Sequence, residues 1–206
     1  MHRDKYATRE KIKNAVGELL VQQGMREMGV NSIAKQAGVD KVLIYRYFGN
    51  LEELLQAFAQ ESNLWPSLGE LFGEKTAIKR TSDIKEVISS FLNGQLSEIR
   101  RRKATQEVLR WETIEENELT RALSSARSEQ TSELLNSISM LKHTNKDLEA
   151  LLALINAGIT YLVLLSKVSD KHLGIDLHSN FGWQRLSNLI NDLVKSYIND
   201  ANVSAR

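Results

Sequence analysis

The sequence predicts an all-α protein, in which an N-terminal helix-turn-helix domain of three helices is followed by a larger helical domain. Proline occurs once in 206 residues, at Pro66, and because proline breaks helices its scarcity favours a helical chain. Apolar residues recur three and four positions apart along most of the chain, as in amphipathic helices, and no segment alternates convincingly as a strand does. The share of hydrophobic residues, 42%, and of charged residues, 26%, is typical of a soluble globular protein.

The first helix is expected from Lys5 to Gln23. Its apolar positions follow the stripe of an amphipathic helix that buries one face. This stripe consists of Ile12, Ala15, Val16, Leu19 and Leu20. Gly24 comes directly after it, and glycine is favoured there because it adopts the left-handed conformation that ends many helices.

Two short helices follow, at Val30–Ala37 and Lys41–Tyr47. Gly38 permits the left-handed backbone of a sharp turn between them, and Asp40 is a good N-cap for the second one. Two helices of about two turns each, joined in this way, have the layout of a helix-turn-helix. Ala34 is small enough to let the two helices cross closely.

The rest of the chain is expected to form longer helices. Asn50 can cap a fourth helix that ends near Pro66, and a boundary is expected within the mixed segment 67–81. Later helices are expected at 83–102, 104–114, 116–141, 146–169 and 182–199. We assign residues 1–50 to the helix-turn-helix domain, with 51–66 as a connecting helix, and residues 51–206 to the second domain.

The helix expected at 146–169 is apolar on nearly all sides, and the final helix has a wide apolar face. In a domain of this size one face meets the core, so the other is expected to meet a second subunit. Two such helices from each of two chains would form a four-helix interface with twofold symmetry. The residues expected in this dimer interface are Leu151, Ile155, Leu162, Leu186, Ile190, Leu193 and Tyr197.

No membrane segment or signal peptide is expected. The longest apolar run, Ala150–Leu165, contains two polar residues and is shorter than the ~20 apolar residues that a membrane span needs. The first residues are charged and contain no apolar core region, so the chain is expected to be cytoplasmic.

The balance of charge hides a split between the two parts of the chain. The whole chain has 27 basic and 26 acidic residues, whereas residues 1–50 contain nine basic and five acidic ones, a net charge of +4. Residues 51–206 carry 18 basic and 21 acidic residues, a net charge of −3. A basic excess on a helix-turn-helix is the electrostatic pattern of a phosphate-binding surface, although solvated faces show similar excesses.

The segment from Thr8 to Leu55 resembles the DNA-binding domain of the TetR family of transcriptional regulators. The residues that match are Thr8, Arg9, Ile12, Ala15, Leu19, Leu20, Gly24, Ile33, Ala34, Ala37, Gly38, Val39, Tyr45, Phe48 and Leu54. The resemblance implies a homodimer that binds a palindromic operator in double-stranded DNA, most often as a repressor. It also implies that a small-molecule effector binds in the larger domain and releases the DNA.

In this family the third helix lies in the major groove. Carried over to this sequence, the resemblance assigns DNA contacts to Lys41, Val42, Leu43, Tyr45, Arg46 and Tyr47. These residue types suit the task, because Lys and Arg bind phosphates or guanine, tyrosine hydroxyls bond phosphates, and Val or Leu packs on thymine methyl groups. Asn31, Ser32 and the free amides at the start of the second helix could hold a further phosphate.

Two phosphate contacts that are usual in the family are missing. Where a Thr or Ser usually begins the second helix, this chain has Met28 and Gly29, and where a Lys usually begins the fourth, it has Leu51. The lost phosphate contacts could be replaced by other basic residues of this domain, namely Arg26, Lys35 and Arg46. The alternative function is therefore a helical protein–protein interaction module whose helix-turn-helix no longer binds DNA.

Residues expected to contact an effector lie on the central helices of the second domain. Asn156 and Thr160 form a polar pair on an otherwise apolar helix, and buried polar groups need partners, which are more often protein groups than ligands. The candidates are Phe91, Gln95, Trp111, Glu112, Asn156, Thr160 and Tyr161.

The sequence contains little that indicates an enzyme or a metal site. The chain has no cysteine and no HExxH, GxSxG or glycine-rich phosphate loop, so no enzyme, metal or cofactor is expected. His172, Asp176 and His178 share one loop, which is interpreted as solvated rather than metal-binding. The basic run at residues 100–103 is interpreted as a solvated helix end rather than a second nucleic-acid site.

Overall fold

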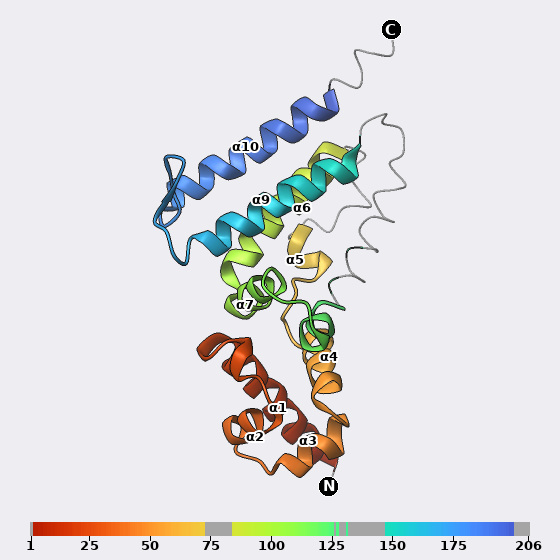
Figure 1. Ribbon diagram of the computed structural model, residues 1–206. Helices are drawn as coiled ribbons and strands as arrows, with labels where there is room; N and C mark the ends of the chain where they lie inside the picture. The colour runs from red at the N-terminus through yellow and green to blue at the C-terminus, as the bar shows by residue number, and fades with distance from the viewer. Residues whose placement is uncertain (1, 73–83, 126, 128–130, 132–146, 200–206) are drawn as a thin grey trace. The chain divides into compact units, whose positions relative to one another are not determined.

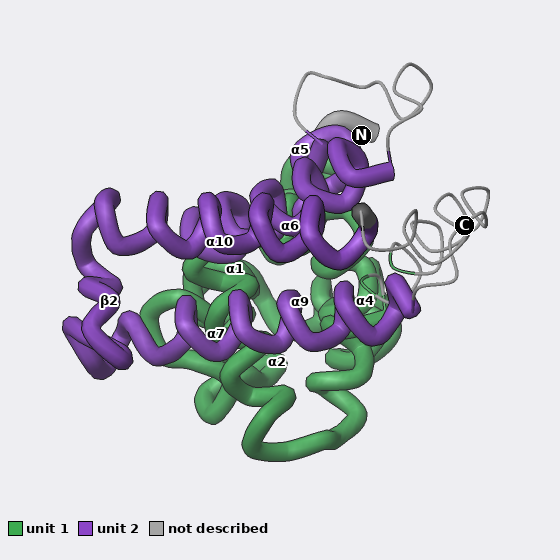
Figure 2. Tube along the Cα trace, turned by 90° about the horizontal axis from the view of Figure 1, so that it is seen from above, with its two compact units in different colours: residues 1–65, 102–131 green, residues 66–101, 132–206 purple. Residues whose placement is uncertain are grey.

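The computed structural model describes residues 2–72, 84–125, 127, 131 and 147–199. The chain divides into two compact units (Figure 2), which we describe separately. Unit 1 comprises residues 1–65 and 102–131, and unit 2 comprises residues 66–101 and 132–206. The predicted all-α fold is confirmed, since the described residues are mainly helical.

Unit 1 contains the helix-turn-helix (Figure 1). Its elements are α1 (His2–Gln22), the 3₁₀ turn η1 (Met25–Glu27), α2 (Val30–Ala37), α3 (Lys41–Phe48), α4 (Leu51–Glu61) and α7 (Lys103–Glu112). Residues 118–125 are also helical. The predicted stripe of α1 is buried, and α1 packs against α2, α4 and α7.

The turn between α2 and α3 has the predicted geometry. Gly38 ends α2 with φ 59° and ψ 44°, in the left-handed region, and the amide of Val39 donates to the carbonyl of Ala34 at 3.0 Å. The carboxylate of Asp40 accepts a hydrogen bond from the amide of Val42 at 2.8 Å, which caps α3. Both short helices therefore begin and end where their residues favour a break.

Segment 102–131 packs onto the N-terminal helices of the same unit. The indole of Trp65 donates to the carbonyl of Leu123 at 2.7 Å, and the guanidinium of Arg127 lies 4.9 Å from the centre of the Trp65 ring. The hydroxyl of Thr105 donates to the carbonyl of Leu64. Buried polar groups are thus paired across a sequence separation of more than 40 residues.

Unit 2 is organised around α6. Its elements are α5 (Leu68–Phe72), α6 (Ile84–Arg101), α9 (Leu148–Leu165), the hairpin strands β1 (Lys171–His172) and β2 (Ile175–Asp176), and α10 (Asn180–Asn199). Helix α6 packs against α5, α9 and α10. It crosses α5 so closely at Gly94 that a Cβ atom there would lie 1.9 Å from the carbonyl oxygen of Leu71.

Three short elements were not expected from the sequence: η1, α5 and the β1–β2 hairpin. The hairpin corrects the prediction that the chain contains no strand. Its strands are only two residues long, too short to show alternation, and they are joined by Leu173 and Gly174, both with positive φ. Helix α4 ends at Glu61, earlier than predicted. The predicted helix 116–141 is confirmed over 118–125, and most of its remaining residues, 126, 128–130 and 132–141, lie outside the described ones.

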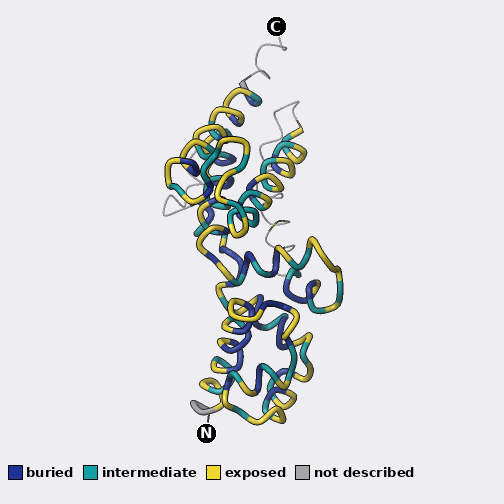
Figure 3. Tube along the Cα trace, turned by 60° about the vertical axis from the view of Figure 1, so that its left-hand side comes forward, coloured by how far each residue is buried: buried dark blue, intermediate teal, exposed yellow. Residues whose placement is uncertain are grey.

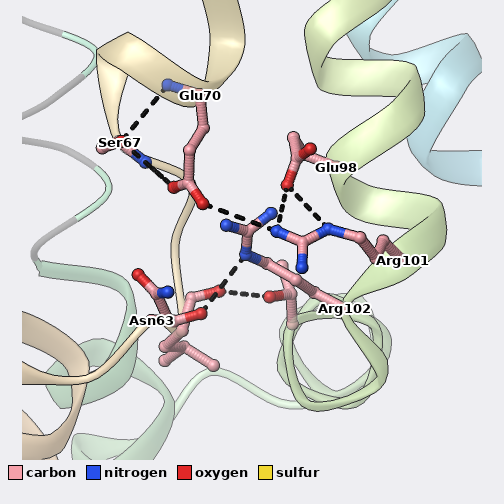
Figure 4. Close-up of polar contacts among 8 residues, drawn as sticks. Asn63, Ser67, Glu70, Glu98, Arg101 and Arg102 are labelled. Atoms are coloured by element: carbon pink, nitrogen blue, oxygen red, sulfur yellow. Dashed lines mark hydrogen bonds and ion pairs between the residues drawn. The ribbon is translucent and has the colours of Figure 1, made fainter. Parts of the chain in front are cut away.

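The basic run 100–103 agrees with the predicted solvated helix end except at Arg102: Arg100 and Arg101 are exposed in the last turn of α6 and Lys103 is exposed at the start of α7, whereas Arg102 is buried. Figure 4 shows the contacts of Arg101 and Arg102. In unit 2, the guanidinium of Arg101 pairs with Glu98 at 2.7 Å and with Glu70 at 3.4 Å. In unit 1, Arg102 is buried and its Nε donates to the carbonyl of Asn63 at 3.3 Å. Arg100 lies over an indole ring. Arg102 is therefore the one residue of the run that is part of the protein interior.

Candidate nucleic-acid interface

Helix α3 presents most of the predicted contact residues on one exposed face. Lys41, Val42, Tyr45 and Arg46 are exposed, with 61% of Val42 and 51% of Tyr45 accessible to solvent. Ile44 and Phe48, on the opposite face, are buried in the core. Leu43 and Tyr47 are half-buried. An exposed apolar and aromatic residue beside two cations is a surface that can meet both thymine methyl groups and phosphates.

Arg9 attaches the C-terminal end of α3 to α1. Its Nη1 donates to the carbonyl of Tyr47 at 2.8 Å, and its guanidinium lies 4.4 Å from the centre of the Phe48 ring. The same side chain pairs with Glu61 at 3.3 Å. Arg9 is therefore a residue that positions α3, and its charge is balanced within the protein.

Lys13 is a second basic residue that faces inward. Only 3% of its side chain is exposed, and its Nζ lies 2.7 Å from carboxylate oxygens of both Glu10 and Glu61. Burial works against the charged amine, but hydrogen bonds and attraction from Glu10 and Glu61 raise the pKa of Lys13. The hydrogen bond from Lys13 and the nearby cations lower the pKa of Glu61 despite its partial burial. Two of the nine basic residues counted in the N-terminal segment therefore do not serve a ligand.

The start of α2 is open for an anion. Gly29 is its N-cap, with an extended backbone, and no side chain caps the helix among the described contacts. Asn31 is exposed and Ser32 half-buried, as their predicted role requires, whereas Met28 is buried in the core. The first amides of a helix have no partner within the helix, and the helix dipole makes this end attractive to phosphate. Arg26 and Lys35 are exposed on η1 and α2.

The predicted effector residues are distributed over both units. Trp111 and Glu112 belong to unit 1, where Glu112 pairs with Arg127 at 2.7 Å and accepts a hydrogen bond from Ser124. The other five, Phe91, Gln95, Asn156, Thr160 and Tyr161, belong to unit 2.

Two of these residues have unpaired buried atoms. The indole Nε1 of Trp111 and the Oδ1 of Asn156 are both buried without a hydrogen-bond partner among the described residues. Phe91, in contrast, is a core residue whose ring packs 6.1 Å from that of Phe72, and Tyr161 is largely exposed. A buried polar atom without a partner is unfavourable, so Trp111 and Asn156 are the best supported of the set.

A cavity that the sequence did not reveal lies between α6 and α10 in unit 2. Its volume is about 260 Å³, and it is lined by Arg100, Trp183 and a set of amide and hydroxyl side chains. None of the seven predicted effector residues lines it. The spacing of Asn180, Gln184 and Ser187 along one face of α10 is the sequence signal that could have indicated it.

Most of the predicted dimer residues are not fully buried within unit 2, and Figure 3 shows how burial varies along the chain. Five of them are half-buried, namely Leu151, Ile155, Leu162, Leu186 and Tyr197, and 46% of Leu193 is exposed. Ile190 is the exception, because it is buried in the core of unit 2 itself. Leu154 and Leu189 extend the exposed apolar surface. Helix α9 is long and apolar enough to cross a membrane, but one such helix is weak evidence for a span.

Comparisons with known proteins connect the helix-turn-helix with one family. Residues 14–58 match the family of bacterial regulatory proteins named after TetR. No curated protein matches the sequence of the chain.

Solved structures of similar fold cover almost the whole chain. The fatty acid degradation regulator FadR of Bacillus halodurans has a TM-score of 0.63 at 20% identity, covering 91% of this chain and 94% of its own. FadR of Bacillus subtilis, solved with stearoyl-CoA, has a TM-score of 0.62 at 23% identity, covering 92% and 98%. A TetR family transcription regulator of Marinobacter aquaeolei VT8 has a TM-score of 0.57 at 16% identity, covering 93% and 97%.

Proposed function

Since residues 14–58 match the TetR family, we propose that the chain is a DNA-binding transcriptional regulator that represses transcription by binding a palindromic operator as a homodimer. Residues 1–50 form the DNA-binding domain in this proposal, and residues 51–206 form the regulatory and dimerisation domain. The observation that carries it is the exposed face of α3, where Lys41, Tyr45 and Arg46 stand beside Val42. Bases and phosphates would be bound by these residues, with Leu43 and Tyr47 at the edge of the contact.

The anion-binding end of α2 supports the same proposal. Asn31, Ser32 and the first amides of α2 would bind a phosphate that flanks the half-site. Such contacts fix the register of the protein on the duplex without selecting a sequence. Base contacts from α3 would then supply the specificity.

The apolar surface of α9 and α10 supports the proposed homodimer. A monomer would leave Leu154, Leu189 and Leu193 exposed to water, whereas twofold association of these helices would bury them. Two reading heads related by a twofold axis require half-sites separated by about one helical turn, ~34 Å, or a multiple of it. The protein would act in the cytoplasm, where its operator lies.

A small-molecule effector would release the operator. The B. subtilis FadR structure contains stearoyl-CoA, so a protein of this fold can hold such a ligand. In this chain, Asn156 and Trp111 have buried polar atoms that could pair with a bound molecule, and Phe91, Gln95, Glu112, Thr160 and Tyr161 are the further candidates. We propose no catalytic activity, metal or cofactor.

The experiment that tests the proposal is selection of bound sequences from random duplex DNA by the purified full-length chain. We expect an enriched sequence with twofold symmetry, bound with an affinity that falls steeply with salt, because counterions are released from phosphates. The same selection distinguishes the alternative, a protein–protein interaction module. Such a module would enrich no sequence and would bind duplex DNA weakly at every salt concentration.

A further inference from the structure

One residue on the exposed face of α3 differs in chemistry from the others. The exposed side chains of this helix are Lys41, Val42, Tyr45 and Arg46. Three of them carry polar atoms that can bond phosphates or base edges. Val42 is 61% exposed, and its side chain can neither donate nor accept a hydrogen bond. Any favourable contact that it makes with a duplex must therefore be apolar.

The position and direction of the Val42 side chain are fixed before any ligand binds. The carboxylate of Asp40 accepts from the amide of Val42 at 2.8 Å, and the carbonyl of Asp40 accepts from the amide of Leu43 at 2.9 Å. Ile44 and Phe48 are buried on the opposite side of α3, which sets the rotation of the helix. A β-branched side chain in a helix has one dominant rotamer, so the two methyl groups of Val42 point in a defined direction.

The start of α3 is a poor place for a phosphate, in contrast to the start of α2. No side chain caps α2 at Gly29, whereas Asp40 caps α3 and places a carboxylate beside Val42. This carboxylate satisfies the amide of Val42 and repels an anion. In a helix-turn-helix, the first residues of the second helix contact base edges. Val42 is therefore placed to meet a base rather than the DNA backbone.

Only one base offers an apolar group in the major groove. Guanine, cytosine and adenine present hydrogen-bonding atoms there, whereas thymine presents its C5-methyl group beside O4. A valine against a purine or cytosine edge would remove water from polar atoms without replacing its hydrogen bonds, which is unfavourable. Contact with the thymine methyl group buries apolar surface on both sides and has no such cost.

We infer that Val42 is a specificity-determining residue, which selects a thymine in each half-site through its C5-methyl group. The inference rests on the proposed function, because it requires an operator bound by α3, and it adds which base is read and by which residue. Arg46 lies four residues further along the helix, a rise of about 6 Å. Any base that Arg46 binds should therefore lie within about two base pairs of this thymine.

Fluorescence anisotropy with the full-length chain and the selected operator tests the inference. Each thymine is replaced in turn, in both half-sites at once, by deoxyuridine, which lacks only the C5-methyl group. One buried methyl group is worth about fourfold in affinity, so at the position that Val42 reads we expect binding to weaken about fifteenfold for the two half-sites together. A C·G pair at that position should also bind weakly, and 5-methylcytosine, which restores the methyl group, should recover part of the affinity.

Val42→Ala assigns the effect to this residue, and its fold should be intact, because the position is exposed and alanine favours helices. This variant should no longer distinguish thymine from deoxyuridine at that position, while its response at every other position stays unchanged. Val21→Ala, at an exposed valine of α1, is the matched control and should keep the full difference.

Two results would overturn the inference while leaving the proposed DNA binding intact. One is an operator in which no thymine is sensitive to deoxyuridine, and the other is a Val42→Ala variant that shows every deoxyuridine effect of the unchanged chain. A selection that enriches no sequence would instead refute the proposed DNA binding, and the inference with it.

Discussion

At the scale of single residues, internal pairing decides which charges can meet DNA. Arg9 and Lys13 are part of the basic excess in the sequence, yet both face Glu61 in the structure. The sequence did not indicate this pairing, because Glu61 lies 48 positions from Lys13 and 52 from Arg9. The exposed cations on α2 and α3 therefore carry the electrostatic part of the proposed interface.

The Lys13–Glu61 pair should make stability depend on pH. Because the pKa of Glu61 is lowered by folding, its contribution is present above the unfolded pKa of about 4.3 and is lost as the pH falls through the folded value. The pKa of Lys13 is raised, so its contribution is lost only as the pH rises above about 10.4. We expect Glu61→Gln to reduce the free energy of unfolding by about 1 kcal/mol at pH 7 and much less at pH ~2, where the carboxylate is protonated in both states.

Urea unfolding of Glu61→Gln and of the unchanged chain at both pH values measures this difference. Glu27→Gln, at an exposed position, is the control and should change stability little at either pH. An equal loss for Glu61→Gln at pH 7 and at pH ~2 would contradict an electrostatic role for the pair.

The exposed face of α3 gives a second prediction at this scale. Lys41→Ala and Tyr45→Ala should each weaken operator binding about tenfold, because each removes a phosphate or base contact. If the lost contact is to phosphate, Lys41→Ala should also make the plot of log affinity against log salt less steep, by a slope of about one. Fluorescence anisotropy with the selected operator measures both effects, and Lys195→Ala, an exposed lysine in unit 2, is the charge-matched control. Unchanged affinity in both variants would show that α3 is not the reading helix.

At the scale of elements, the long amphipathic helices and the helix-turn-helix were predictable, and the short elements were not. The long helices repeat their apolar spacing often enough to be placed within a few residues, and the two short ones have clear glycine and N-cap signals. The helices placed in this way are α1, α2, α3, α6, α9 and α10. Helix α5 has only five residues, but Ser67 and Glu70 cap it reciprocally, and this Ser-x-x-Glu pattern could have predicted it.

Sites were less predictable than elements. The contact face of α3 followed from the family motif and its exposure agrees with that role, whereas Ile190 proved to be a core residue. The α6–α10 cavity depends on the packing of two helices that lie about 80 positions apart in the sequence. The apolar periodicity within each helix does not determine how the two helices pack.

The uncapped start of α2 gives a prediction about an element. A Cβ atom at Gly29 would meet nothing within 4 Å, and the backbone there is extended, so Gly29→Ser is sterically allowed. The new hydroxyl should cap α2 and raise stability by a few tenths of a kcal/mol. It should also tighten operator binding about threefold by one added phosphate contact. Gly29→Ala separates the effect of the hydroxyl from that of the added carbon, and operator binding that is no tighter for Gly29→Ser than for Gly29→Ala would refute the predicted phosphate contact.

At the scale of the whole molecule, the chain presents two kinds of surface. The N-terminal helices present exposed cations and a helix end that no side chain caps, and α9 and α10 present leucines. The first surface suits a polyanion and the second suits another copy of the same surface.

The apolar surface predicts the oligomeric state. We expect the chain to sediment as a dimer at micromolar concentration and Leu193→Glu to sediment as a monomer, because burying an unpaired carboxylate in the interface is unfavourable. Val21→Glu, at a similarly exposed position on α1, should remain dimeric. A monomeric unchanged chain, or a dimeric Leu193→Glu variant, would contradict the assignment of α10 to the interface.

The β1–β2 hairpin makes the chain convenient for spectroscopy. Leu173 is 91% exposed at its tip, and the chain contains no cysteine. Leu173→Cys would therefore provide a single reactive thiol per chain, at a position whose side chain makes few contacts. In a symmetric dimer, two spin labels attached there would form one defined pair. The distance between them could be measured directly, with and without DNA.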